Sequence, residues 1–175
     1  MSTAYLSLDG PHDLCPWHKA VWFKGHIPKH AFCLWVACHH RHPTHDRIIA
    51  WKHDPPDFKC SLCLSCMDSH FHLFFECVYS KEVWDEVLVA IDWHDFPTSW
   101  GDIVSAISRT APPRLIQRLA LAGTVYMVWQ ERNRRIFTND KRPPIVLIKE
   151  ILSTIRMKVE WELKRKRISN EDVGA

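Results

Sequence analysis

The stretch CSLCLSCMDSHFHLFFEC, residues 60–77, places four cysteines and two histidines within eighteen residues. Cys60 and Cys63 form a Cys-x2-Cys pair, which is typical of a tight turn that directs two thiolates at one ion. His72 and Cys77 follow, and about one turn of helix would return both to the same point. The four side chains predict a closed Cys3His shell around one structural zinc ion. A closed shell has no position for an activated water, so we expect the zinc to hold the fold and not to do chemistry.

The same stretch offers alternative ligands. Cys63 and Cys66 form a second Cys-x2-Cys pair, which could replace the pair at Cys60. His70 could stand in for His72, although residues two apart on a helix point to different faces. We favour His72, because three large apolar residues follow it and could seat the site against a core. The competing interpretation is a set of buried free thiols and surface histidines that hold no metal.

The composition indicates a folded protein in a reducing compartment. The 175 residues are 46% hydrophobic, with nine Trp and only five Gly, which argues against intrinsic disorder. Seven Cys is an odd number and no hydrophobic signal peptide opens the sequence, which favours metal ligation over disulfides. No run of about 18 apolar residues is present, so we expect no membrane span. We therefore expect an intracellular protein.

The charged residues are unevenly distributed. Residues 1–111 have a net charge of −4, whereas residues 112–175 have a net charge of +7. Simple electrostatic contact with RNA or DNA is therefore expected from the C-terminal half. The candidate contact residues are Arg132, Arg134, Arg135, Lys164, Arg165, Lys166 and Arg167. The competing interpretation is that these residues are ordinary solvated helix ends.

Helical periodicity dominates the sequence, and the strand signal is weak throughout. Helices are expected over residues 15–25, 29–40, 45–51, 78–91, 100–107, 113–137 and 145–167. Ser80 is expected to cap the fourth of these, and the small residues Ala122 and Gly123 to let another helix approach closely. We predict a mainly α fold: a small helical domain with one structural zinc knuckle, at most a short hairpin beside it, and then a C-terminal region of long helices.

Proline-rich breaks and changes in polarity suggest how the chain is divided. The expected parts are a flexible leader (1–14), a zinc-binding domain (15–92), a connector (93–112), a helical region (113–168) and a polar tail (169–175).

The order of these motifs resembles a known family. The residues that carry the resemblance are Trp17, Trp22, Ile27-Pro28, Cys60-x2-Cys63, His72-Leu73-Phe74-Phe75-x-Cys77, Trp84 and, downstream, Trp129-x-Glu131-Arg132-Asn133-x-Arg135-x-Phe137. They resemble the zinc-binding domain that follows the polymerase in plant non-LTR (LINE-type) retroelement reverse transcriptases. The resemblance covers roughly residues 15–137. It implies zinc ligands at Cys60, Cys63, His72 and Cys77, the same four that the residue types and spacing in residues 60–77 predict.

The sequence also departs from that family. Phe71 stands where the family often has an acidic residue, and Cys66 adds a thiol that the site does not need. The sequence contains no Tyr-x-Asp-Asp pair and no carboxylate set typical of an RNase H. We therefore expect a detached fragment of a retroelement protein, or a host protein descended from one.

Three classes of function compete. The first is a zinc-stabilised accessory module that binds RNA or DNA through its basic half, with Trp129 or Phe137 stacking on a base, and without catalysis of its own. The second is a structural or protein–protein interaction module that docks on a reverse transcriptase or on another copy of itself. An enzyme is least expected, because no spaced catalytic set is present. The run from Lys164 to Arg167 is also typical of a nuclear localisation signal.

Overall fold

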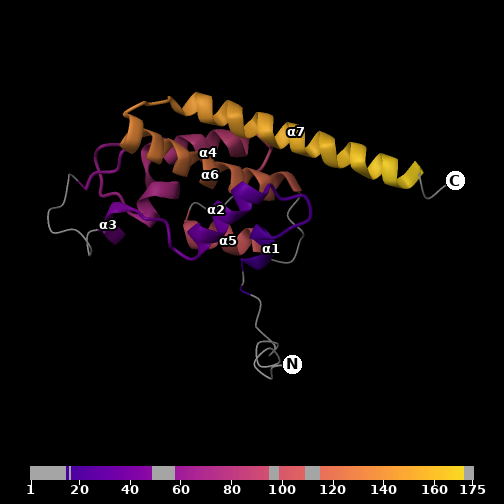
Figure 1. Ribbon diagram of the computed structural model, residues 1–175, viewed down its shortest axis with the longest axis horizontal. Helices are drawn as coiled ribbons and strands as arrows, with labels where there is room; N and C mark the ends of the chain where they lie inside the picture. The colour runs from indigo at the N-terminus through magenta and orange to yellow at the C-terminus, as the bar shows by residue number, and fades with distance from the viewer. Residues whose placement is uncertain (1–14, 16, 49–57, 95–98, 109–114, 172–175) are drawn as a thin grey trace, which may run out of the picture.

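The computed structural model describes residues 15, 17–48, 58–94, 99–108 and 115–171, and shows a helical protein with one long C-terminal helix (Figure 1). The helices of this part are α1 (His18–Val21), α2 (Pro28–Cys38), α3 (His45–Ile48), the π-helix η3 (His72–Glu76), α4 (Val78–Ala90), α5 (Trp100–Ser108), α6 (Leu115–Thr138) and α7 (Pro144–Glu171). The described residues form no extended strand, only an isolated antiparallel bridge between Lys59 and Met67. The predicted mainly α fold is confirmed.

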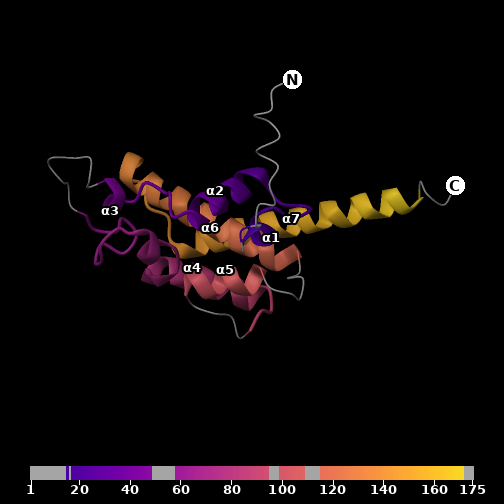
Figure 2. The ribbon, with the colours of Figure 1, turned by 90° about the horizontal axis from the view of Figure 1, so that it is seen from below.

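The long helices α6 and α7 pack against the helices of the N-terminal half. Helix α6 contacts α2, α4 and α7, and α7 also contacts α4. Figure 2 shows α6 between α2 on one side and α4 on the other. The core takes fully buried side chains from all four helices, namely Leu34, Val83, Leu121 and Ile151. The predicted connector at residues 93–112 therefore separates two parts that share one core.

The small residues of α6 allow close packing of helices, as the sequence predicted. A Cβ atom at Gly123 would lie 3.6 Å from Cγ2 of Ile151 in α7 and 3.9 Å from Nδ1 of His30 in α2. Ala122 is also buried. Gly123 thus lies where three helices meet.

Two local predictions were wrong. Helix α4 already begins at Val78, and Ser80 does not cap it; the buried Ser80 hydroxyl donates to the carbonyl oxygen of Leu73 at 2.6 Å and so ties α4 to η3. The first helix is only four residues long, because the backbone already leaves the helical conformation at Trp22, with φ of −104° and ψ of 78°. Gly25, whose φ of +94° suits glycine best, lies in the turn that follows. The leader at residues 1–14 and the proline breaks at residues 55–56 and 112–113 lie outside the described residues.

The C-terminal half of α7 extends away from the rest of the molecule in both views (Figures 1 and 2). It carries three large apolar side chains that are exposed, Trp161, Leu163 and Ile168, and Met157, just before it, is exposed as well. Among the described helices, none combines the length and the apolar character that crossing a membrane would need. This projecting half of α7 offers a surface that the core does not use.

His30 is an uncharged histidine in the core. Its ring is 1% exposed and stacks on Tyr126 with 4.5 Å between the ring centroids. Burial, with a smaller effect of the Lys29 charge, lowers the pKa of His30 to about 4. The neutral ring is therefore the form that the fold accommodates.

We expect His30 to make folding sensitive to mild acid. Its folded pKa lies below the unfolded value near 6.5, so its stabilisation is complete above about pH 6.5 and is lost as the pH falls towards 4. Over that range the wild type should lose about 3 kcal/mol more than His30→Phe, which cannot be protonated. Urea unfolding of both proteins at pH 7.0, 5.5 and 4.5 measures this difference. Acid also releases zinc, but that loss affects the wild type and the variant alike and so cancels in the comparison. Parallel pH profiles would show that His30 is not the titrating group.

Candidate metal centre

The structure brings the four predicted zinc ligands to one point. The ligand atoms of Cys60, Cys63, His72 and Cys77 all lie within 4.8 Å of one another. The two sulfur atoms of Cys60 and Cys77 are 3.9 Å apart, and Sγ of Cys63 is 3.2 Å from Nε2 of His72. Zinc–sulfur bonds of about 2.3 Å in a tetrahedron place two sulfurs about 3.8 Å apart. The donor set and its spacing thus fit one structural zinc ion.

A tight turn places the first two ligands. The backbone N–H of Cys60 donates to the carbonyl oxygen of Cys66 at 2.7 Å, and the N–H of Leu64 donates to the carbonyl oxygen of Cys60 at 2.8 Å. Leu64 adopts the left-handed conformation, with φ of +60°, which reverses the chain directly after Cys63. These bonds close a small knuckle, which we define as residues 59–67, and it presents the thiols of Cys60 and Cys63 together.

A widened helical turn places the other two ligands. His72 and Cys77 are five residues apart, and an α-helix would set them about 140° apart around its axis. The chain instead forms the π-helix η3, in which the N–H of Cys77 donates to the carbonyl oxygen of His72 at 2.7 Å. This i to i+5 bond makes five residues span about one full turn, so both side chains reach the same side. The turn predicted from the sequence is therefore present, but as a π-helix.

The two alternative ligands lie elsewhere. Cys66 is exposed, and its thiol is outside the group of four. His70 is 2% exposed and belongs to the aromatic core, with its ring centroid 4.4 Å from that of His40 and 5.1 Å from that of Trp100. Burial lowers the pKa of His70 to about 3, so this ring is neutral.

The thiols of Cys60 and Cys77 influence each other. Cys60 donates a hydrogen bond to Cys77, and this bond lowers the pKa of the Cys77 thiol while it raises that of Cys60. Zinc binds thiolates and not thiols, so loading the site releases protons. Acid therefore favours release of the metal.

A buried ion pair holds the knuckle against α6. Asp68 is fully buried just after the knuckle, and its carboxylate accepts hydrogen bonds from the guanidinium of Arg132, with Nε 3.2 Å from Oδ2. The same oxygen accepts the backbone N–H of His45 at 2.9 Å. The Arg132 side chain is 4% exposed. The structure thus places Arg132, which the sequence suggested as a nucleic-acid contact, in the interior against a carboxylate of the protein.

Arg135 makes a second link between the knuckle and α6. Its Nη1 donates to the carbonyl oxygens of Ser61 and Leu62, at 3.2 Å and 2.9 Å, and its Nε donates to Glu131 at 2.8 Å. The side chain is 9% exposed. The structure thus also places Arg135 in the interior, where all these donors are used by the protein itself.

The remaining candidates lie far apart. Arg134, at the end of α6, is half-exposed and pairs with Asp140, whereas Lys164–Arg167 lie exposed on the projecting half of α7 (Figure 1). Of the two proposed stacking residues, Trp129 packs against His42 with 4.2 Å between ring centroids, and only Phe137 is freely exposed. The structure therefore does not gather the predicted contacts into one surface.

The role of Asp68 was not predicted from the sequence. One signal was available, because Asp68 is the only acidic residue between positions 60 and 75. A lone carboxylate among so many apolar and ligand residues requires a partner when it is buried. What the sequence does not indicate is that the partner lies 64 residues further along the chain.

A comparison with known protein families finds a match in the N-terminal half. Residues 1–84 match the family described as zinc-binding in reverse transcriptase. This confirms the resemblance drawn from the sequence over that half, which includes all four ligands. The segment at residues 129–137 lies outside the match. No curated protein and no solved structure matches the chain.

We expect one zinc ion per chain, bound through Cys63 and not through Cys66. Cys63→Ser should lose the metal and much of the fold, because structural zinc contributes on the order of 10 kcal/mol. Cys66→Ser is the matched control and should keep one zinc and the helical signal. Native mass spectrometry and circular dichroism measure both. A folded Cys63→Ser variant that still holds zinc would contradict this assignment.

We expect Arg132 to stabilise the fold strongly. Arg132→Met leaves Asp68 buried without its charge partner, which should lower the free energy of unfolding by about 3–5 kcal/mol. Arg134→Met removes only an exposed ion pair with Asp140 and should change the free energy of unfolding by less than about 1 kcal/mol. Urea unfolding in the presence of zinc measures both variants. Equal effects would show that the buried pair contributes no more than a surface pair.

Proposed function

We propose that this chain, whose residues 1–84 carry a zinc-binding domain of the reverse-transcriptase type, is an accessory module that binds RNA or DNA through α7 and has no catalysis of its own. In this proposal the zinc holds the fold, and the contact with nucleic acid is made elsewhere. The plant retroelement origin suggested by the sequence belongs to the same proposal. A reverse transcriptase is the natural partner of such a module.

The observation that carries the proposal is the charge on the projecting half of α7. Residues 156–167 include six basic and two acidic side chains. Lys164, Lys166 and Arg167 are exposed and form no ion pair with any residue that the structure describes. Cations that no carboxylate neutralises, on a helix that projects into solvent, are suited to a phosphate backbone. The same run also supports a proposal of nuclear import.

The metal centre supports a structural role for the zinc. Three thiolates and one imidazole complete a tetrahedral shell, which has no open position for a substrate or a water. Arg135 holds the backbone of the knuckle, so the shell is also fixed from outside. A rigid, closed centre of this kind is suited to stability and not to chemistry.

A protein-interaction module is the second candidate, and one observation favours it. The projecting half of α7 also exposes Trp161, Leu163 and Ile168. Exposed apolar side chains of this kind are suited to packing against another protein. The partner would be a reverse transcriptase or a second copy of this chain.

Salt titration tests the nucleic-acid proposal. Labelled single-stranded RNA, single-stranded DNA and duplex are each titrated with the protein between about 20 and 200 mM salt, where counterion release weakens electrostatic binding steeply. Removing three cations with Lys164→Gln/Lys166→Gln/Arg167→Gln should reduce the slope of log K against log salt by about 2.

The matched control removes three exposed cations away from that run, with Arg134→Gln/Lys141→Gln/Lys149→Gln, and should bind like the wild type. Loss of binding in the control alone would move the contact to the end of α6, the loop after it and the first turns of α7. No binding by the wild type at low salt would contradict the nucleic-acid proposal. Light scattering of the same samples then tests whether α7 mediates self-association.

A further inference from the structure

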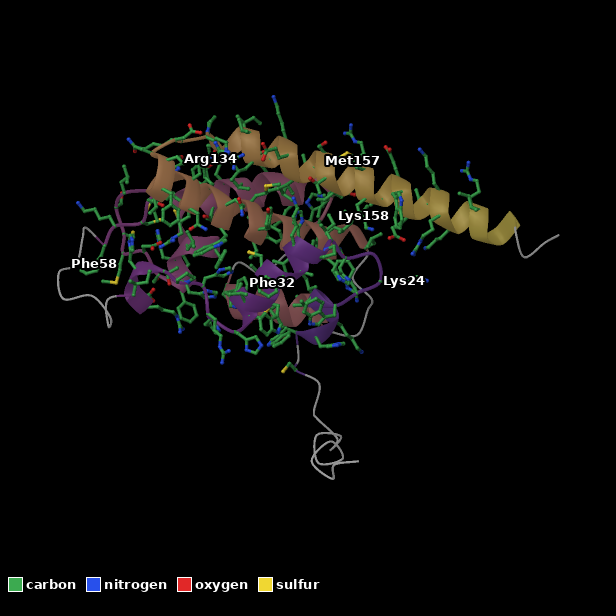
Figure 3. All side chains as sticks on the ribbon, in the orientation of Figure 1. Lys24, Phe32, Phe58, Arg134, Met157 and Lys158 are labelled. Atoms are coloured by element: carbon green, nitrogen blue, oxygen red, sulfur yellow. The ribbon has the colours of Figure 1, made fainter. Side chains whose placement is uncertain are left out.

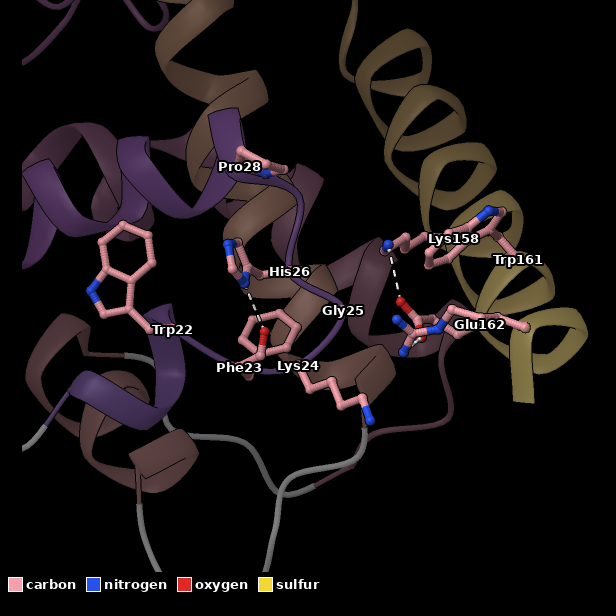
Figure 4. A pocket seen from close by; sticks show the side chains of 10 residues that line it. Trp22, Phe23, Lys24, Gly25, His26, Pro28, Lys158, Trp161 and Glu162 are labelled. Carbon is pink, nitrogen blue, oxygen red and sulfur yellow. Dashed lines mark hydrogen bonds and ion pairs between the residues drawn. The ribbon is translucent and has the colours of Figure 1, made fainter. Parts of the chain in front are cut away.

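A cleft of about 480 Å³ opens between the turn that joins α1 to α2 and the projecting half of α7 (Figure 4). Its lining includes Trp22, Phe23 and Lys24 from the turn and Lys158, Trp161 and Arg165 from α7. The cleft lies well away from the metal centre: Figure 3 shows Lys24 and Lys158 far from Phe58, which comes just before the knuckle. The cleft is therefore a separate feature of the fold.

The turn is built to approach α7 closely. Gly25 has a φ of +94°, and a Cβ atom there would lie 3.0 Å from Oε1 of Glu162. Nδ1 of His26 is 2.7 Å from the carbonyl oxygen of Phe23, and this hydrogen bond holds the turn (Figure 4). Glu162 is buried at this contact, 5% exposed, and carries ion pairs to Lys158 at 3.1 Å and Arg165 at 2.7 Å. One buried carboxylate thus fixes two cations at the edge of the cleft.

Aromatic rings and cations alternate along the cleft. Trp161 is 51% exposed, with Nζ of Lys158 4.1 Å and Cζ of Arg165 5.1 Å from its ring centroid. Trp22, on the wall formed by the turn, is 40% exposed. Planar rings next to cations are the elements with which proteins stack single-stranded bases and hold the adjoining phosphates.

The charge of the cleft also favours an anionic ligand. Glu162 is the only acidic residue of the lining, against Lys24, Lys158 and Arg165. Lys24 has no ion pair within the described part of the chain. The exposed run Lys164–Arg167 continues the positive charge along α7.

A second groove, between α6 and α7, provides a contrast. It contains Phe137, 79% exposed, and the cations Lys29, Arg134 and Arg142 against the carboxylate of Glu150, which is the same balance of charge as in the cleft. Arg134 is paired with Asp140, and Arg142 with Glu131 and Glu150. What distinguishes the cleft is its two exposed indole rings, Trp22 and Trp161, where the groove offers the smaller ring of Phe137.

We propose that this cleft is the base-stacking site for single-stranded RNA or DNA. Bases stack on Trp161 and Trp22, and the phosphates pass along Lys24, Arg165 and the cations that follow on α7. The proposal rests on the nucleic-acid function proposed above and gives it a location. It also makes the site selective for single strands, because the bases of a duplex already stack on one another.

Equilibrium binding of 12-residue oligouridine, oligothymidine and a duplex of the same length tests the site at about 20 mM salt. Trp161→Ala and Trp22→Ala should each weaken binding of the single strands by about tenfold and leave duplex binding nearly unchanged. Phe137→Ala, which removes the exposed ring of the second groove, should bind like the wild type. Zinc content and circular dichroism verify that each variant is folded. The oligouridine and oligothymidine arms show whether RNA or DNA is preferred.

Each other outcome overturns the proposal in a distinguishable way. Wild-type binding that neither Trp variant weakens removes the cleft as the site and leaves the nucleic-acid function standing. Equal weakening for single strands and duplex excludes base stacking. No wild-type binding to any of the three probes contradicts the proposed function as well. Loss of self-association in the Trp variants, with nucleic-acid binding intact, would make the cleft a contact between two copies of the chain.

Discussion

The buried ion pair between Asp68 and Arg132 joins two parts of the chain that lie 64 residues apart. The knuckle contains little that could hold it by itself, since one isolated bridge and a few turn hydrogen bonds close it. Arg132 holds the segment that follows the knuckle, and Arg135 holds backbone carbonyls of the knuckle itself. Helix α6 therefore positions the ligands Cys60 and Cys63. Removing either charge of the buried pair leaves the other buried without water and without a partner, which is costly. A buried pair of this kind can therefore fix one arrangement of the two segments even where it adds little net stability.

This dependence extends the zinc-binding domain beyond the residues that match the family. The match ends at residue 84, within α4, whereas the groups that hold the knuckle come from α6. The contacts of residues 129–137 offer a physical reason for the sequence resemblance in this segment. Its glutamate and arginines bind the protein's own backbone and carboxylates, and Trp129 packs against His42. The zinc site and the long helices are therefore parts of one folding unit.

The sequence predicted the helices and the chemistry of the ligands well, because both leave local signals. Apolar residues recur at helical spacing over α4, α6 and α7, and thiols at Cys-x2-Cys spacing have few other uses in a reducing compartment. The π-helix left no such signal, since its wider turn follows from the need to bring His72 and Cys77 together. The burial of Arg132 and Arg135 was missed because charged residues are mostly exposed, and their acceptors, Asp68 and the carbonyls of Ser61 and Leu62, lie far away in the sequence. The cleft beside Trp161 likewise depends on a distant turn, at Gly25.

The length of α7 has a mechanical consequence. Its 28 residues span about 42 Å, and its last turns continue beyond the contact between Glu162 and the turn at Gly25. Because α4 and α6 hold one end of α7, the helix carries its other end outward as a rigid rod. A strand of nucleic acid held in the proposed cleft at Trp161 would therefore be kept at a set distance and direction from the zinc centre.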